Sequence, residues 1–306
     1  MRRRFAVVFN ARAGSAVPRL LDGVLAELRA VHRCDVFQLP ARSAEEAAER
    51  VGEAATRDVC DAVIAAGGDG TFRAVATGAA GTGLPVGLIP LGTGNVLAHE
   101  LGLVRRSAAL ADTLLNGPVI PAHASLVNGA PFFLMVGAGF DGRVVAGLNY
   151  RSKRVFGRAA YTAPVLRALR HGVEVFDVVL DGERFEASWI IVTRASHYGG
   201  QFVVTGDTGV GRAPLIAIII AARTRRDLIS AALALPLGRM VDASKRPPFV
   251  TIREARHVEI GKRRSVAVEV DGDAATPTPA VINADGPVVR LIVPACYAGA
   301  LSVADR

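Results

Sequence analysis

The stretch Gly67-Gly68-Asp69-Gly70-Thr71 decides the fold of the first part of this chain. It follows an apolar run at residues 61–66, which predicts a buried parallel strand, and it precedes residues 72–75, which predict a helix start. Glycines let a backbone approach an anion closely, and a helix N-terminus presents N–H groups to it. Asp69 would repel phosphates unless a cation lay between them, and Mg²⁺ prefers carboxylate and phosphate oxygens. The stretch therefore predicts Mg-nucleotide chemistry; the structural alternative is a tight turn with a surface aspartate.

The bulk composition sets limits on the class of protein. The 306 residues suggest two domains, although one large domain also fits. With 51% apolar and 21% charged residues, a substantial core can form. The net charge of +8 favours an acidic partner such as a nucleotide, a nucleic acid or an anionic membrane. An Arg- and Ala-rich composition can also produce this charge without any such partner.

The cysteines and the hydropathy pattern bear on location. Cys34, Cys60 and Cys296 are odd in number and share no metal-like spacing, so we expect reduced thiols in a cytoplasmic protein. No segment reaches the roughly 18 apolar residues that a membrane span needs.

Strands and helices alternate in the first third of the chain and strands dominate afterwards. Repeated βα units predict a parallel sheet with helices on both faces. We expect a nucleotide-binding α/β domain at residues 1–120 and a β-sandwich at residues 121–306. The first domain has expected strands at 4–10, 35–39, 62–66 and 86–90 and helices at 17–31, 44–57, 71–78, 96–101 and 107–116. The second has expected strands at 173–180, 183–193, 215–222, 251–254, 257–260, 266–270 and 288–293 and helices at 157–170 and 225–235.

Three loops follow strand ends, where ligands collect in parallel sheets. The first contains Asn10 and Gly14, and an ordinary turn explains it equally well. The second is Gly67–Thr71. The third contains Gly92, Thr93 and Asn95. Thr93 can donate to a phosphate or a ribose, whereas Asn95 can alternatively cap the next helix.

Asp271-Gly272-Asp273 follows an alternating strand at residues 266–270. One interpretation is an Asp-Gly hairpin turn. The other is a pair of acids, one holding Mg²⁺ and one deprotonating a substrate hydroxyl.

Basic clusters occur at residues 151–154, 223–226 and 262–264. Singly, such clusters are solvated surface. Together they can dock an anionic membrane. They lack interleaved aromatic residues, so we expect no nucleic-acid partner.

The ordered motifs resemble the bacterial lipid kinases of the diacylglycerol kinase and sphingosine kinase superfamily, nearly end to end. Residues 136–141, 153–161 and 198–200 extend the resemblance. It implies a Rossmann-like α/β domain, as in the NAD kinase and diacylglycerol kinase folds, and a β-sandwich for the lipid. It also implies that the last 15 or so residues return to the first domain.

The resemblance further implies ATP, Mg²⁺ and transfer of the γ-phosphoryl group to a lipid hydroxyl, such as that of diacylglycerol or a sphingoid-type lipid. Asp273 would accept the proton, assisted by Asp271, and Asp69 with Asp271 would hold Mg²⁺. A transient membrane contact follows, and a homodimer is left open. Residues implied at the nucleotide are Asn10, Gly14, Gly67, Gly68, Asp69, Gly70, Thr71, Phe72, Arg73, Gly92, Thr93 and Asn95.

The chain departs from the family pattern in several places, and two of them concern acids. Family members commonly have Glu where this chain has Asp273, which has one methylene less. Many also bind a structural metal in the region of residues 206–212, where Arg212 stands near an expected acid. Two alternatives to a lipid kinase are an NAD kinase, which shares the Gly67–Thr71 turn, and a non-catalytic module that binds nucleotide or lipid.

Overall fold

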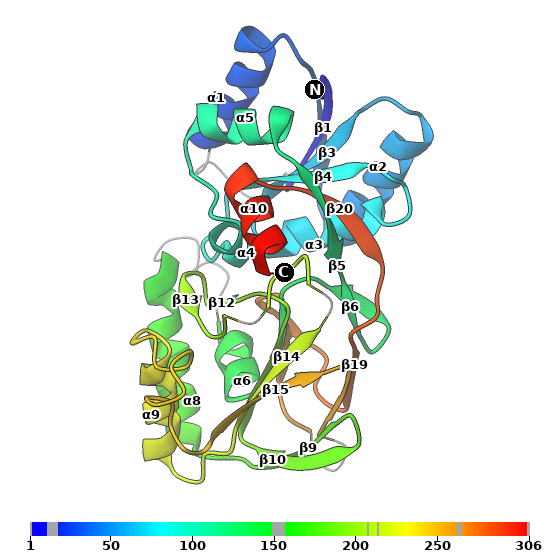
Figure 1. Cartoon of the computed structure of the whole chain (residues 1–306). Helices are drawn as coiled ribbons and strands as arrows, with labels where there is room; N and C mark the ends of the chain where they lie inside the picture. The colour runs from blue at the N-terminus through cyan, green and yellow to red at the C-terminus, as the bar shows by residue number, and fades with distance from the viewer. Residues whose placement is uncertain are drawn as a thin grey trace. The chain divides into compact units, whose positions relative to one another are not determined.

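The computed structural model describes residues 2–10, 18–148, 157–206, 208–212, 214–261 and 265–304 (Figure 1). The chain forms two compact units. The first unit combines Met1–His123 with Pro287–Arg306, and the second is Ala124–Gly286. The chain thus leaves the first unit, forms the second and returns. The two ends of the second unit meet, because a Cβ on Gly286 would lie 2.8 Å from the carbonyl oxygen of Ala124.

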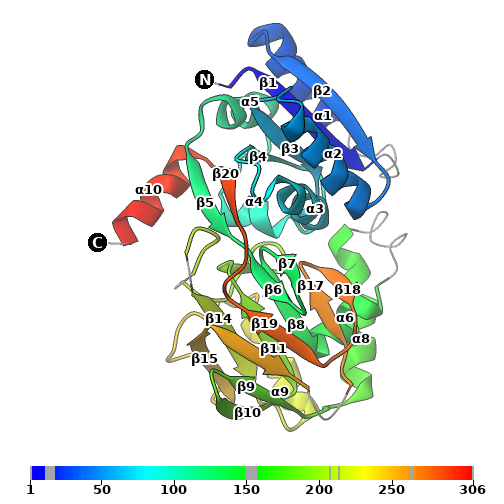
Figure 2. The same ribbon diagram turned by 90° about the vertical axis from the view of Figure 1, so that its right-hand side faces the viewer.

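The first unit is built on a mostly parallel six-stranded sheet, which confirms the predicted fold class. The strands β1, β3 and β4 are continuous apolar runs, as expected where helices cover both faces of a sheet. The strand near the C-terminus, β20, pairs in parallel with β4 and antiparallel with β5 (Figure 2). In sheet order the strands are β2 (Asp35–Ala41), β1 (Arg4–Asn10), β3 (Ala62–Gly67), β4 (Pro85–Pro90), β20 (Val288–Ile292) and β5 (Val119–His123).

Helices lie on both sides of this sheet (Figure 1). The helix predicted at residues 17–31 is an α-helix followed by one π-helical turn, η1. Side chains of α1, η1 and α5 share a core with strand residues such as Phe5 and Ile64, while α2 and α3 pack together. The helices are α1 (Pro18–Ala26), η1 (Glu27–Val31), α2 (Ala44–Thr56), α3 (Asp69–Ala79), α4 (Val96–Glu100), α5 (Ser107–Asn116) and α10 (Ala295–Ala304).

The second unit contains two antiparallel six-stranded sheets, as predicted for a β-sandwich. Side chains from both sheets form one buried cluster. One sheet has the order β10 (Glu183–Ala187), β9 (Phe176–Leu180), β16 (His257–Ile260), β19 (Ala280–Asn283), β6 (Ser125–Val127) and β7 (Ala130–Phe132). The other has the order β15 (Val250–Ala255), β14 (Leu215–Ile220), β11 (Trp189–Thr193), β8 (Met135–Gly139), β17 (Val268–Val270) and β18 (Asp273–Ala275).

The strand predicted at residues 183–193 is two strands, because the chain changes sheet at Ser188. The N–H and hydroxyl of Ser188 both donate to the carbonyl oxygen of Ile220, at 2.9 and 3.1 Å. The remaining elements are a short hairpin of β12 (His197–Tyr198) and β13 (Phe202–Val203), and the helices α6 (Phe140–Ala146), η2 (Gly157–Tyr161), α8 (Thr162–His171) and α9 (Arg225–Ala234).

None of the helices in the described part of the chain combines the length and apolar character needed to cross a bilayer. All three cysteines have free thiols, and Cys34 and Cys60 are buried.

Candidate active site

The first glycine turn begins helix α3 earlier than the sequence predicts. The helix starts at Asp69 rather than Thr71, and Gly68 is its N-cap residue, with no side-chain cap bond. Because the first N–H groups of a helix have no intrahelical acceptor, the first turn of α3 offers backbone donors at the positive end of the helix dipole. This is a suitable end for a phosphate.

The two glycine loops pack against each other at the ends of adjacent strands. Gly67 is in register with Pro90, and the N–H of Leu91 donates to the Gly67 carbonyl oxygen at 2.9 Å. A Cβ on Gly92 would lie only 2.6 Å from the Cα of Gly68. The approach of the loops therefore requires glycine at this contact.

Asp69 ties the first loop to the second. Its Oδ2 accepts the N–H of Val96 at 3.0 Å and its Oδ1 accepts the N–H of Leu97 at 3.1 Å. Asp69 thus caps α4, a helix that begins 27 residues further along the chain. Asn95 is the N-cap residue of this helix, as its alternative interpretation predicts, but its side chain makes no cap hydrogen bond. Asn95 is buried in a left-handed conformation with φ of 48°, and its side-chain amide donates to the Gly92 carbonyl oxygen at 2.5 Å.

The donor set around Asp69 suits a magnesium nucleotide. Its carboxylate lies at the start of both α3 and α4, where helix dipoles favour negative charge. Mg²⁺ in proteins is usually held by one or two carboxylates together with substrate phosphates and water. Asp69 is partly exposed, so its carboxylate fits the role of a metal-holding residue.

Other residues predicted at the nucleotide have different positions. Phe72 is 1% exposed, so its ring packs in the core, and its predicted contact with the nucleotide stays a prediction. Arg73 and Thr93 are partly exposed. Asn10 is the last residue of β1. Gly14 lies outside the described residues.

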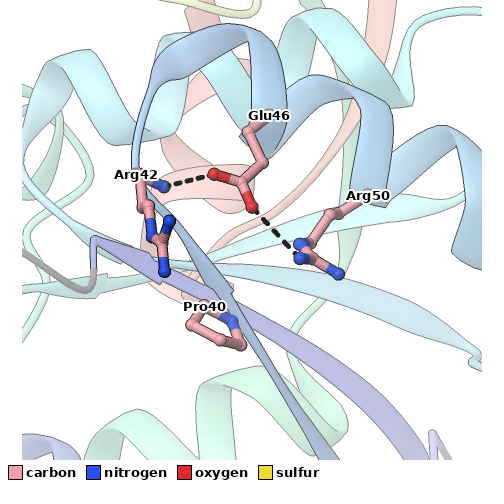
Figure 3. A pocket seen from close by; sticks show the side chains of 4 residues that line it. All are labelled: Pro40, Arg42, Glu46 and Arg50. Carbon is pink, nitrogen blue, oxygen red and sulfur yellow. Dashed lines mark hydrogen bonds and ion pairs between the residues drawn. The ribbon is translucent and has the colours of Figure 1, made fainter.

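A cavity of about 390 Å³ lies at the end of β2 and the start of α2. Figure 3 shows Glu46 within it, accepting the N–H of Arg42 at 2.8 Å and Nη2 of Arg50 at 3.1 Å. Pro40 completes its lining. Because the sheet order is β2-β1-β3, the cavity is two strands, roughly 10 Å, from the Gly67 turn. It adds two arginines to the same edge of the sheet, which the sequence did not predict.

In the second unit, Asp271 and Gly272 form a two-residue hairpin turn between β17 and β18. Their φ angles of 50° and 84° are those of a type I′ turn, the hairpin interpretation of this motif. The buried carboxylate of Asp271 accepts the N–H groups of Phe133, Leu134 and Met135 at 3.2, 2.9 and 3.0 Å. These bonds fix the hairpin to the start of β8. Asp271 therefore has a structural role in this turn, and its predicted role as a metal ligand stays a prediction.

Asp273 is the first residue of β18 and is paired with Val270. It is partly exposed, unlike Asp271. Its role as proton acceptor stays a prediction.

A buried acid pair that the sequence did not predict lies beneath this hairpin. Asp141 and Glu269 are 5% and 2% exposed. The Tyr198 hydroxyl donates to Asp141 Oδ1 at 2.6 Å, and the Gly272 N–H donates to Glu269 Oε2 at 2.7 Å. Their other oxygens, Asp141 Oδ2 and Glu269 Oε1, would lie 2.1 and 2.8 Å from a Cβ at Gly137. These two oxygens have no donor among the described protein groups, so one proton shared between them satisfies both.

The pKa values of this pair are strongly perturbed. Burial raises the pKa of Asp141 to about 6, while hydrogen bonds from Tyr198 and Glu269 work against that rise. Burial and then the charge of Asp141 raise the pKa of Glu269 well above its usual value. The two carboxyl groups titrate as an interacting pair, and their burial favours keeping a proton between them. The sequence shows one sign that Glu269 is unusual: it is an acid within an otherwise apolar strand. All three residues of that strand, Val268–Val270, are buried.

A second metal centre finds no support in the described part of the chain, where no three His, Cys, Asp or Glu side chains gather as metal ligands would. Asp207, in the loop where the family resemblance places a structural metal, lies outside the described residues.

Comparison with known proteins identifies the family. The model of the diacylglycerol kinase catalytic domain matches residues 4–127. The model of the YegS C-terminal NAD kinase beta sandwich-like domain matches residues 134–297, more than half of the chain. The chain belongs to the diacylglycerol kinase and YegS-like lipid kinase family. It is a kinase, and the resemblance inferred from the motifs is confirmed.

Individual relatives of this lipid kinase agree with that result. A diacylglycerol kinase of Mycobacterium tuberculosis is 29% identical over 295 residues, covering 92% of this chain and 91% of the relative. A diacylglycerol kinase of Bacillus subtilis is 28% identical over 238 residues, covering 75% and 76%. A crystal structure of a diacylglycerol kinase from Bacillus anthracis has a TM-score of 0.70 at 18% identity, covers 97% of this chain and 98% of that one, and shows the shared fold.

Proposed function

We propose that this chain is an ATP-dependent lipid kinase that transfers the γ-phosphoryl group to a hydroxyl of a lipid such as diacylglycerol or a sphingoid-type lipid. The observation that carries the proposal is the tie that Asp69 makes between the two glycine loops. It combines two backbone loops and two helix starts into one rigid anion site. Phosphoryl transfer depends mainly on positioning and charge stabilisation, and such a site supplies both.

The nucleotide phosphates would bind the N–H groups at the start of α3, where Gly68 leaves the helix without a side-chain cap. Asp69 would hold Mg²⁺, which when bound neutralises charge on the phosphates. Arg42 and Arg50, at the neighbouring strand end, add positive charge to this edge of the sheet.

Asp273 would accept the proton of the acceptor hydroxyl as its oxygen bonds to the γ-phosphorus and the bond to the β–γ bridging oxygen breaks, releasing ADP. Support for this assignment is the contrast with its neighbour. Asp271 is committed to three backbone amides, whereas Asp273 is partly exposed on a hairpin that those bonds hold in place. A lipid acceptor also implies contact with a membrane surface.

The test is phosphoryl transfer by the purified chain. Labelled ATP with Mg²⁺ is incubated with mixed micelles of diacylglycerol, with micelles of a long-chain sphingoid base, or with NAD. We expect a labelled lipid and no labelled NAD phosphate. Labelled NAD phosphate would instead support the NAD kinase alternative.

Variants locate the activity. Asp69→Asn removes the charge and also turns an amide group toward the N–H groups of Val96 and Leu97, and Asp273→Asn removes the base, so each should lower kcat by roughly 10²-fold or more. Asp22→Asn, an exposed acid on α1, is the matched control and should leave kcat unchanged. A folded protein that phosphorylates no lipid, or full activity in both site variants, would overturn the proposal.

A further inference from the structure

The second unit exposes an apolar surface on two helices. Five large apolar side chains on α8, α9 and the turns after α9 are between 42% and 58% exposed. We call them the α8–α9 surface: Leu166, Ile229, Leu233, Leu237 and Val241. Single exposed leucines are ordinary, whereas a concentration of them on neighbouring elements marks an interaction site.

The two helices lie side by side on the same side of the second unit (Figure 1). The Arg225 guanidinium at the start of α9 donates to the carbonyl oxygen of Arg170 near the end of α8 at 2.9 Å. Ile229 and Leu233 are four residues apart on α9 and therefore share a face. The other face of α9 carries buried residues and is anchored in the unit. The exposed face is thus held rigidly outward.

Positive charge predominates in the segments that carry this surface, although Arg223 pairs with Glu186 at 2.5 Å. Residues 162–171 and 223–246 contain eight lysines and arginines and only two acids. Both acids are engaged within the protein: Asp227 completes the capping box of α9, and Asp242 pairs with Lys245 at 2.8 Å. Arg226 and Arg239 are exposed. A partner that fits this surface is therefore both apolar and anionic.

We infer that the α8–α9 surface docks the enzyme on an anionic lipid bilayer, with the apolar side chains in the boundary between headgroups and acyl chains and the arginines at lipid phosphates. Interfacial segments combine apolar side chains with flanking cations in this way. A protein partner fits less well, because protein interfaces favour Trp and Tyr, and neither segment contains an aromatic residue. The inference rests on the proposed function in one respect, since a lipid acceptor gives the enzyme its reason to bind a bilayer.

The test is flotation of the full chain with vesicles of phosphatidylcholine alone or with a third of phosphatidylglycerol, without ATP. We expect binding to the anionic vesicles that weakens with salt. The pair Leu233→Gln and Leu237→Gln should weaken it at least about tenfold. The pair Arg226→Glu and Arg239→Glu should weaken it by at least about 25-fold, because each near-surface cation contributes about fivefold.

The matched controls change exposed residues of the same kind in the first unit. Val31→Gln with Val104→Gln replaces apolar side chains that are 64% and 54% exposed, and Arg57→Glu reverses an exposed charge. Controls that bind like the unmodified chain, with surface variants that do not, support the inference. Equal binding by surface variants, or no binding by the unmodified chain, overturns it. The inference is also overturned if the surface variants change their oligomeric state in sedimentation but bind vesicles as before. The surface would then be a contact between copies of this chain.

Activity on a short-chain, water-soluble diacylglycerol separates this inference from the proposed function. Surface variants should retain that activity while losing activity on vesicle-embedded lipid. Vesicle binding can depend on the surface even if neither the unmodified chain nor any variant phosphorylates a lipid. That result would support the docking surface and overturn the proposed function.

Discussion

Replacing Gly92 by alanine tests how closely the two glycine loops must pack. The new Cβ would lie 2.6 Å from the Cα of Gly68, whereas ordinary contact begins at 3.4 Å, so the loops must separate by about 0.8 Å. The obstructing atom, the Cα of Gly68, belongs to the backbone, so no side-chain rotation can relieve the clash. Overpacking of this kind costs about 1–3 kcal/mol. At about 3 °C per kcal/mol for a unit of this size, Tm should fall by roughly 3–9 °C.

The same displacement should reduce catalysis more than stability. A misplacement near 1 Å can lower a rate by about 10²-fold. The assay is lipid phosphorylation at saturating ATP, combined with thermal unfolding of the same preparation. We expect a large loss of kcat at a temperature well below the lowered Tm, where the variant is fully folded.

Gly94→Ala is the control within the same loop. Its Cβ would lie 3.7 Å from Oδ2 of Asp69, an ordinary contact, and Gly94 does not adopt a positive φ. Its Tm should stay within about 2 °C of the unmodified chain, corresponding to less than about 1 kcal/mol. If Gly92→Ala unfolds at the same temperature as Gly94→Ala and keeps full kcat, the reasoning about loop contact is refuted.

Three further predictions concern the second unit. Because Glu269 has a raised pKa in the folded state, its contribution to stability is present below its unfolded pKa of about 4.3 and is lost as pH rises through the folded value. The side chain in Glu269→Gln cannot titrate, so the free energy of unfolding in urea should depend less steeply on pH between pH 5 and pH 8 than in the unmodified chain. An unchanged dependence on pH would contradict the raised pKa of Glu269. Tyr198→Phe removes a bond that favours the ionised form of Asp141 and should lower the free energy of unfolding by about 1.5–3 kcal/mol at pH 7, and less at pH 5, below the Asp141 pKa of about 6. Asp271→Asn turns an amide donor toward backbone donors and should lower Tm in thermal unfolding, whereas a Tm equal to that of the unmodified chain would argue against its role in the turn.

The sequence predicts the features that are local. The Gly67–Thr71 turn, its flanking strand and the alternation of strands and helices are legible because each depends on residues within one βα unit. Apolar strands buried on both faces and amphipathic helices carry distinct periodicities. The hairpin at Asp271-Gly272 is similarly legible, since a two-residue turn with positive φ favours these residues.

The features that sequence reasoning missed are contacts between distant residues. Asp69 caps a helix that begins at Val96, and no local pattern distinguishes it from a solvent-facing acid. Asp141 and Glu269 meet only because β8 and β17 are neighbours in one sheet. Strands β6 and β7 have three residues each, too few to show a period. The structural role of Asp271 could not be read from the sequence, because the three amides that donate to it belong to the distant residues 133–135.

The position of β20 has a consequence for biosynthesis. This strand fills the place between β4 and β5, yet it is made after the whole of the second unit. While the ribosome is still adding residues 124–286, β4 has an unpaired edge and β5 lacks β20 as its partner strand, and such strands invite pairing with other chains. A truncation after Gly286 would make that exposure permanent. The second unit can fold before the first is finished, because its two ends already lie together at Ala124 and Gly286. The first unit is therefore the first to be translated and the last to be completed.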